Sequence, residues 1–284
     1  MPRMAVEKEL LAPPLSNRYA LVGVAFDYLM RFYLERLNPG AITKQWVAEL
    51  ALLSLSLWEE PPAVLVDGSG RVRVLLEPIE DLDIPKPKPK DAETVEKICW
   101  MIEQAKADHA RYLDSGQITD SLIESALRLA QLDFIFRPGY IDEKLGYVHR
   151  EDVDDLRRLI SLVEPQLFKT SRLCILNPTF GEGSRLVGGA DADLVIDDAL
   201  IDIKTTKYLK LTRDHFHQLI GYFVLHTIDG VDGPTRKPKV SKVGIYFSRH
   251  AYLYTLDLSD VIHPETFPAF VDWFITRAKQ EYAA

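Results

Sequence analysis

The chain has 284 residues, of which 47% are hydrophobic and 27% are charged, and its formal net charge is −8. Such a chain can bury a substantial core, as one elaborated domain or as a domain with an insertion. The negative charge argues against a protein that coats nucleic acid non-specifically, although an enzyme acting on nucleic acid needs only local positive charge. No stretch is apolar enough to span a membrane, and the N-terminus lacks a secretory signal, so we expect a cytoplasmic protein.

The N-terminal residues predict helices. Residues 19–37 have helical periodicity, and the pattern stops at Asn38-Pro39-Gly40. A second helix is expected at 43–58. The first of these is the expected core helix of this part of the chain.

A hairpin and a connector are expected next. The hairpin covers 63–76 and turns at 67–70. The alternating Pro-Lys run at 84–90 predicts an extended, semi-rigid connector. We therefore place an N-terminal part at 1–90.

The composition changes after the connector, and residues 91–167 are predicted to be mainly helical. The expected helices cover 92–114, 118–132 and 151–166. This stretch is a helical insertion in our interpretation. The sequence leaves open whether it clamps substrate, recruits a partner or covers a sheet edge. Its Cys99, like Cys174 further on, lies in an apolar context typical of a buried free thiol.

Residues 168–284 alternate between predicted strands and helices. The expected order is a strand (172–180), a turn (181–183), an acidic hairpin (188–204), a helix (215–227), a second hairpin (240–248 and 251–258) and a closing helix (264–281). This order supports an α/β sandwich with a mixed sheet.

The acidic hairpin is the most informative stretch. Alternation places Asp191 and Asp193 on one face of its first strand, opposite a core face of alanine and aliphatic residues. On the second strand, Asp202 and Lys204 lie on the face that carries the acids. If residues 197–198 form a two-residue turn, Asp193 lies directly opposite Asp202, and Asp191 faces Lys204.

Two carboxylates in this position repel each other. At a separation of ~5 Å and an effective dielectric constant of ~20, the repulsion costs about 3 kcal/mol, so the pair favours a bound cation or a proton. Two carboxylates with open positions for water and a phosphate suit Mg²⁺ or Mn²⁺ better than zinc. The alternative is a solvated polar face, whose charges stay apart in water. We favour the metal site.

A family resemblance starts from these residues. Asp193, followed by Leu-Val-Ile and then by Asp202-Ile203-Lys204, resembles the PD-(D/E)xK nuclease signature. Gln218 and Tyr222 downstream have the Gln-x-x-x-Tyr spacing typical of the RecB-like branch of that superfamily. The resemblance covers mainly residues 170–258. It implies a restriction-endonuclease-like sandwich, in which helices flank a central mixed sheet, and a nuclease that hydrolyses DNA with Mg²⁺, for which Mn²⁺ substitutes.

The resemblance also implies a ligand set. Asp193 and Asp202, helped by the Ile203 carbonyl, would bind the cation, which lowers the pKa of a bound water. Asp191 fits the Gly-x-x-Asp spacing of the family, whereas Asp193 better fits the cross-strand pairing. Either acid is therefore a candidate for the principal ligand.

The remaining catalytic roles follow from the same resemblance. Lys204 would orient the attacking water and stabilise negative charge on the phosphate. Gln218 and Tyr222 would position the strand or support the metal shell. The reaction would be an in-line attack on a phosphodiester.

A weaker part of the resemblance lies on the first helix. Gly23, Asp27 and Arg31 are spaced by four and share a face. RecB-like proteins often place a metal-binding histidine where this chain has Asp27. Asp27 is thus either a metal ligand or the partner of Arg31 in a plain helix pair.

Basic residues follow the second strand of the acidic hairpin. Lys207, Lys210, Arg213 and His215 are candidates for contact with DNA, or with RNA, although charged runs are more often solvated faces. Two other functions stay open: a non-catalytic nucleic-acid-binding or assembly module that keeps the nuclease fold, and a phosphoesterase for a small nucleotide. The sequence does not distinguish end-dependent from internal cleavage.

Overall fold

The computed structural model describes residues 2, 4, 6–66, 72–77, 86–136 and 141–282. They fold into two compact units. Unit 1 contains Met1–Pro14, Tyr33–Thr43 and Ser161–Ala284, and unit 2 contains Leu15–Phe32 and Lys44–Ile160. These units cut across the domain limits expected at residues 90 and 167, and those limits stay a prediction.

Unit 1 is built on a mixed sheet with the strand order β3-β4-β5-β6-β7. The strands are β3 (Cys174–Leu176), β4 (Leu194–Ile196), β5 (Ala199–Lys204), β6 (Lys242–Phe247) and β7 (Tyr252–Asp257). β5 and β6 are parallel, and the other neighbours are antiparallel. Parallel neighbours need a crossover, which α6 (Arg213–Asp229) supplies. The predicted α/β fold with a mixed sheet is confirmed.

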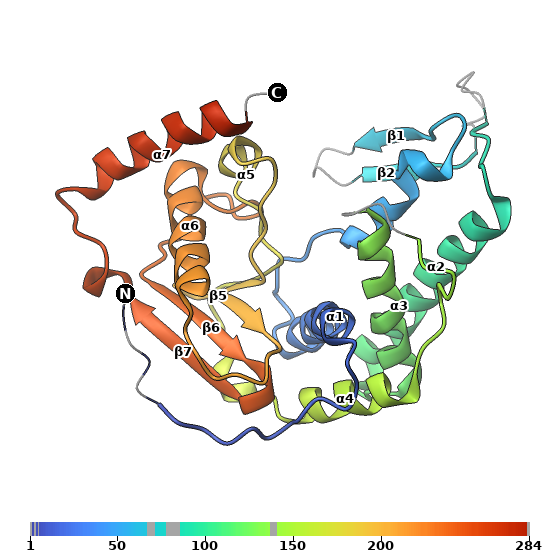
Figure 1. The fold of residues 1–284 in the computed structure, drawn as a ribbon, viewed down its shortest axis with the longest axis horizontal. Helices are drawn as coiled ribbons and strands as arrows, with labels where there is room; N and C mark the ends of the chain where they lie inside the picture. Colours follow the sequence, from blue (N-terminus) through green and yellow to red (C-terminus); the bar gives the residue numbers. More distant parts are fainter. Residues whose placement is uncertain are drawn as a thin grey trace. The chain divides into compact units, whose positions relative to one another are not determined.

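Helix α6 covers one face of this sheet and contacts β5 and β6, as Figure 1 shows. Val195 and Leu200 of the sheet are buried in a core that includes Leu219 and Leu225 of α6. The short helix α5 (Glu182–Leu186) approaches α6 at Gly183, where a side chain would meet the Leu225 carbonyl oxygen at 2.9 Å. Glycine therefore permits this close contact.

The opposite face of the sheet is also buried. Cys174 and Ile201 lie on it, because they alternate with the residues that face α6. Asn38, at the end of α1 (Tyr19–Leu37), donates through Nδ2 to the Phe168 carbonyl at 3.1 Å and contacts Cys174 Sγ at 3.8 Å. Burial raises the pKa of the Cys174 thiol to about 12. Cys174 and Cys99 are both free thiols; Cys174 is buried, as predicted, whereas Cys99 is only partly buried.

Unit 2 is mainly helical. Its elements are the first part of α1, the 3-10 segments Val47–Leu53 and Leu55–Leu57, the hairpin of β1 (Ala63–Val66) and β2 (Val72–Leu75), α2 (Ala92–Ser115), α3 (Asp120–Phe136) and α4 (Arg150–Ser161). The helices expected from the sequence in 19–37 and 91–167 are confirmed, with ends that shift by a few residues. Among the described residues, no helix combines the length and the apolar character needed to cross a membrane.

One predicted helix, at 43–58, is wrong. The segment instead forms two short 3-10 helices that are separated at Ser54, whose backbone is extended. The Trp58 indole N–H donates to the Leu52 carbonyl at 2.6 Å. That carbonyl would otherwise accept from the next turn of an α-helix, so the aromatic side chain stabilises the break.

Two further expectations in unit 1 need correction. The strand expected at 172–180 ends at Leu176, because Asn177 adopts a left-handed φ of 52°. The turn expected at 181–183 opens α5 instead, and Asp229 accepts the Glu182 N–H at 2.8 Å. The turn expected at 67–70 and the start of the connector at 84–90 lie outside the described residues.

Candidate active site

The two-residue turn of the acidic hairpin is confirmed. Ile196 pairs with Ala199 across the turn, and Asp197 adopts a left-handed φ of 55°. Aspartate tolerates this conformation, since its short polar side chain bonds locally. The Asp197 carboxylate accepts hydrogen bonds from Thr170 and Arg172.

This turn sets the register of the candidate site. Leu194 pairs with Ile201, and continuing the register by one residue places Asp193 opposite Asp202. The Asp193 carboxylate accepts the backbone N–H of Ile203. Strand β4 begins only at Leu194, so Asp193 precedes the regular ladder, whereas Asp202 lies within β5.

Asp202 and Lys204 form the inner part of the site. Asp202 is 3% exposed, and its Oδ2 lies 2.8 Å from Lys204 Nζ. The Lys204 side chain keeps 26% of its surface exposed. A buried carboxylate thus holds the ammonium of a lysine that still reaches solvent.

The face that carries these acids differs from the expectation. The sequence pattern places the core on the opposite face of these strands, but Val195 and Leu200 on the acid face are fully buried as well. The reason is α6, which covers this face with its own apolar side chains. The carboxylates therefore lie at the edge of a core, where water screens charge less than at an open surface.

Helix α6 brings the predicted Gln-x-x-x-Tyr pair to this face. Gln218 Nε2 donates to the Tyr222 hydroxyl at 2.8 Å, and the Tyr222 ring stacks on Phe180 with centroids 5.7 Å apart. Burial raises the pKa of Tyr222 far above its ordinary value, and the charges of Asp202, Asp193 and Asp191 raise it further. Three carboxylates of the hairpin therefore act on one phenol.

His215 lies at the start of the same helix. The Thr212 side chain accepts the His215 N–H at 3.2 Å and caps the helix. Burial lowers the pKa of the imidazole, and the nearby Lys204 charge lowers it further, while Asp202 opposes them. His215 thus lies within electrostatic reach of Asp202 and Lys204.

Asp191 precedes Asp193 by two residues and also lies outside strand β4. It forms an isolated bridge with Thr179 and lines a hollow of about 360 Å³ together with Gln218 and Tyr222. Phe274 of α7 (Phe267–Tyr282) and Gly221 also line this hollow. The sequence analysis does not predict a role for these two residues. The sequence signal for Gly221 is a glycine inside a helix, between Gln218 and Tyr222.

The remaining predicted residues are placed as follows. Lys207, Lys210 and Arg213 are exposed in or next to the loop between β5 and α6. Asp27 belongs to unit 2, where its carboxylate pairs with Arg31 Nη2 at 2.5 Å. The helix pair with Arg31 is therefore present, and a metal role for Asp27 stays a prediction.

The donor set fits a divalent cation only with help from other ligands. Within the described part of the chain, no group of three or more histidine, cysteine or acidic side chains could hold a metal ion. Two facing carboxylates remain, and Mg²⁺ commonly uses one or two carboxylates and completes its shell with water and substrate oxygens. The residues thus fit a weakly held cation that substrate helps to bind, rather than a closed structural site.

Comparison with known proteins finds no family model, curated protein or solved structure that matches this chain. The resemblance to the PD-(D/E)xK superfamily therefore stays a prediction. It rests on the residues of the acidic hairpin and of α6.

Proposed function

We propose that unit 1 is a divalent-metal-dependent nuclease that hydrolyses phosphodiester bonds in DNA. The observation that carries the proposal is the buried Asp202 carboxylate, which lies 2.8 Å from Lys204 Nζ in a hairpin whose Asp193 carboxylate accepts the neighbouring Ile203 N–H. Acids that only solubilise a surface stay apart in water, whereas these acids share one electrostatic environment beside Lys204.

Asp193 and Asp202 would hold the cation, and the Ile203 carbonyl and Asp191 are the further candidate ligands. A bound Mg²⁺ polarises the scissile phosphate and lowers the pKa of a coordinated water. The Lys204 ion pair with Asp202 is compatible with this role, because a lysine that holds a carboxylate can turn to a phosphate oxygen once a cation takes the carboxylate.

The chain's own residues supply the other contributions to hydrolysis. The water oxygen forms a bond to phosphorus, the bond to the leaving oxygen breaks, and that oxygen leaves with a proton. Lys204 stabilises the negative charge that builds on the phosphoryl oxygens. It also orients the attacking water from its position beside Asp202.

Gln218 and Tyr222 would position the substrate strand. Their hydrogen bond fixes both side chains next to the hollow lined by Asp191. The Tyr222 hydroxyl accepts from Gln218 Nε2 and keeps its own proton, which it can donate to a substrate oxygen.

Cleavage of DNA by the whole chain tests this function. In a panel of linear, circular, single-stranded and duplex DNA, at least one substrate should be cut with Mg²⁺ or Mn²⁺, and cutting of the circular forms would identify internal cleavage. Asp202→Asn and Lys204→Ala should each lose about 10²- to 10³-fold in rate, the range seen when a charge-stabilising group is removed. Asp272→Asn and Lys279→Ala, exposed positions on α7, are matched controls that should cut like the unaltered chain.

Two outcomes would favour a different function. DNA or RNA binding without cleavage of any polymer would favour the non-catalytic module. Processing of a mononucleotide without cleavage of a polymer would favour the small-nucleotide phosphoesterase. Full activity in both Asp202→Asn and Lys204→Ala would contradict the mechanism.

A further inference from the structure

The loop between β5 and α6 presents an aromatic ring to solvent. Tyr208 is 66% exposed, and Lys207 Nζ lies 5.2 Å from the centroid of its ring. Lys210 and Arg213 are exposed in the same stretch. Residues 204–214 contain four basic side chains and one acidic side chain, so this segment is locally positive in a chain whose formal net charge is −8.

The loop is anchored on both sides of Tyr208. Leu211 is buried, and Leu209 packs against the same core. The Tyr208 N–H donates to Thr206 Oγ1 at 3.2 Å, and Thr205 Oγ1 lies 3.1 Å from Ser248 Oγ. The alternation of buried leucines with exposed lysine and tyrosine therefore presents the ring outward from a fixed backbone.

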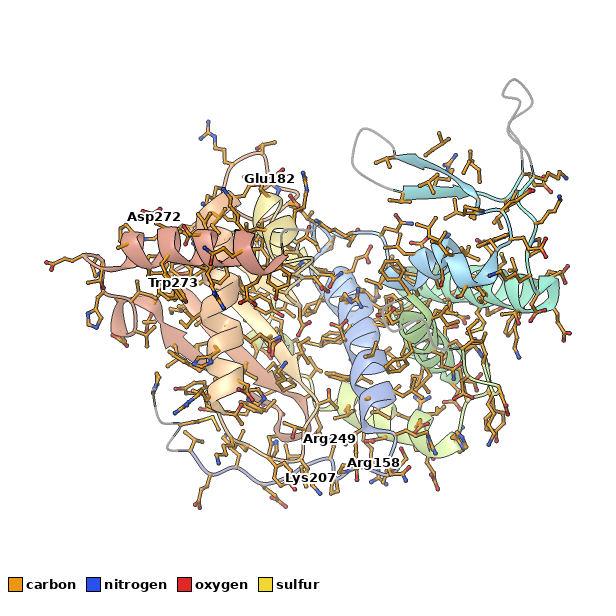
Figure 2. The ribbon with its side chains drawn as sticks, turned by 45° about the horizontal axis from the view of Figure 1, so that its top comes forward. Arg158, Glu182, Lys207, Arg249, Asp272 and Trp273 are labelled. Carbon is orange, nitrogen blue, oxygen red and sulfur yellow. The ribbon has the colours of Figure 1, made fainter. Side chains whose placement is uncertain are left out.

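The loop lies close to the candidate site. Lys204 ends β5 and pairs in register with Phe247, the last residue of the parallel strand β6. Figure 2 accordingly places the labels of Lys207 and Arg249 at the same end of unit 1. Four residues of extended chain span at most about 14 Å, so the Tyr208 backbone lies within about four nucleotide spacings of Lys204.

We propose that Tyr208 stacks on an unpaired base of the substrate strand, while Lys207 and its basic neighbours hold the phosphates. Exposed aromatic rings beside basic side chains bind single strands in this way, because every base offers a flat face once it leaves the duplex stack. The preference for a single-stranded segment next to the cleaved bond rests on the proposed nuclease function. The binding itself does not require hydrolysis.

Fluorescence anisotropy with labelled oligo(dT) and with a duplex of the same length tests this proposal. The measurements are made in EDTA, so that nothing is cut. Tyr208→Ala should weaken binding of the single strand about 5- to 100-fold, the range of one base stack, and should change duplex binding less than 2-fold. Tyr208→Phe keeps the ring and should bind like the unaltered chain.

Two more variants separate stacking from charge and from general surface effects. Lys207→Ala should weaken single-strand and duplex binding alike and reduce the salt dependence of both. Tyr147→Ala removes a tyrosine of similar exposure in unit 2 and should leave binding of both probes unchanged.

Binding of oligo(dT) by Tyr208→Ala at the unaltered affinity would overturn the proposal. So would equal losses for single strand and duplex, or an unaltered chain that binds no single strand. Ring-dependent single-strand binding by a protein that never cuts DNA would refute the nuclease function and keep this inference. DNA cleavage by a chain whose single-strand binding is unchanged by Tyr208→Ala would refute this inference and keep the nuclease function.

Discussion

Each unit has a buried carboxylate, and the two are equally hidden from solvent. They differ in the groups that surround them. Asp108 in unit 2 and Asp202 in unit 1 are each 3% exposed. Asp108 is surrounded by donors: it accepts from Gln104, Ser121, Ser125 and Arg111. Asp202 pairs with Lys204 but lies across from Asp193, a second carboxylate.

The two carboxylates also differ in their electrostatic setting. Burial by itself raises the pKa of Asp108, but hydrogen bonds from Ser125, Ser121, Gln104 and Arg111 outweigh it and hold the pKa below its ordinary value. Around Asp202, burial and the acids raise the pKa of the neighbouring Tyr222 instead. Asp108 is thus surrounded by hydrogen-bond donors, whereas Asp202 shares its surroundings with a lysine and with other carboxylates.

The largest expected effect separates these two carboxylates by stability. Asp108→Ala leaves several donors without their acceptor, and since each buried donor left unpaired costs about 1 to 3 kcal/mol, we expect it to lower the free energy of unfolding by about 2 to 5 kcal/mol. Asp202→Asn removes both a repulsion from Asp193 and an attraction to Lys204, whose partly exposed ammonium can turn to water, so we expect its free energy of unfolding to stay within about 1 kcal/mol of the unaltered chain. Urea denaturation followed by circular dichroism measures both.

The reverse ranking would break the comparison. If Asp202→Asn unfolded as easily as Asp108→Ala, Asp202 would be a structural residue. Its loss of activity would then carry no information about catalysis.

A buried histidine gives the next largest effect. Here the fold loses stability when the side chain gains a charge. Burial lowers the pKa of His226 to about 4, and the charge of Lys237 contributes, from an ordinary value of 6.5. Between these two pKa values the unfolded chain binds more protons than the folded chain, so the free energy of unfolding falls as the pH falls. The stability that comes from burying the neutral imidazole is therefore complete above pH 6.5 and is lost as the pH falls toward 4. The loss amounts to about 3 kcal/mol at most.

The contribution of His226 can be isolated by subtraction. His226→Phe should flatten the dependence of the free energy of unfolding on pH between 6.5 and 4, relative to the unaltered chain. A difference between the two chains that does not change with pH would show that His226 titrates normally in the folded state.

Two glycines of unit 1 give the smallest effect. A side chain at Gly221 in α6 meets nothing within 4 Å, so Gly221→Ala should raise the free energy of unfolding by about 0.5 to 1 kcal/mol. At Gly183 the added carbon would meet the Leu225 carbonyl oxygen at 2.9 Å, and Gly183→Ala should destabilise the chain. Thermal unfolding of the two variants measures both changes in stability. Stabilisation by Gly183→Ala would show that α5 can move away from α6.

The register of the site could be predicted from the sequence, because it depends on local chemistry. A two-residue turn of aspartates and a period-two pattern suffice to place Asp193 opposite Asp202, and the observed pairing agrees. The helix at 19–37 was predicted to the residue, since its periodicity stops at a clear Asn-Pro-Gly signal.

Other features depend on contacts between distant residues and could not be predicted in this way. The burial of Val195 and Leu200 on the acid face requires α6 to fold back over β5. The 3-10 break at Ser54 depends on the Trp58 indole, and the hollow beside Tyr222 depends on Phe274 from the last helix. Periodicity identifies which residues are apolar, but it does not say which element covers them.

Calorimetric titration with Mn²⁺ tests most directly whether the acids of the hairpin form a cation site. The unaltered chain should show saturable binding that Asp193→Asn and Asp202→Asn abolish. Asp272→Asn on the surface of α7 should bind as the unaltered chain does. Unchanged Mn²⁺ binding in both Asp193→Asn and Asp202→Asn would contradict the account.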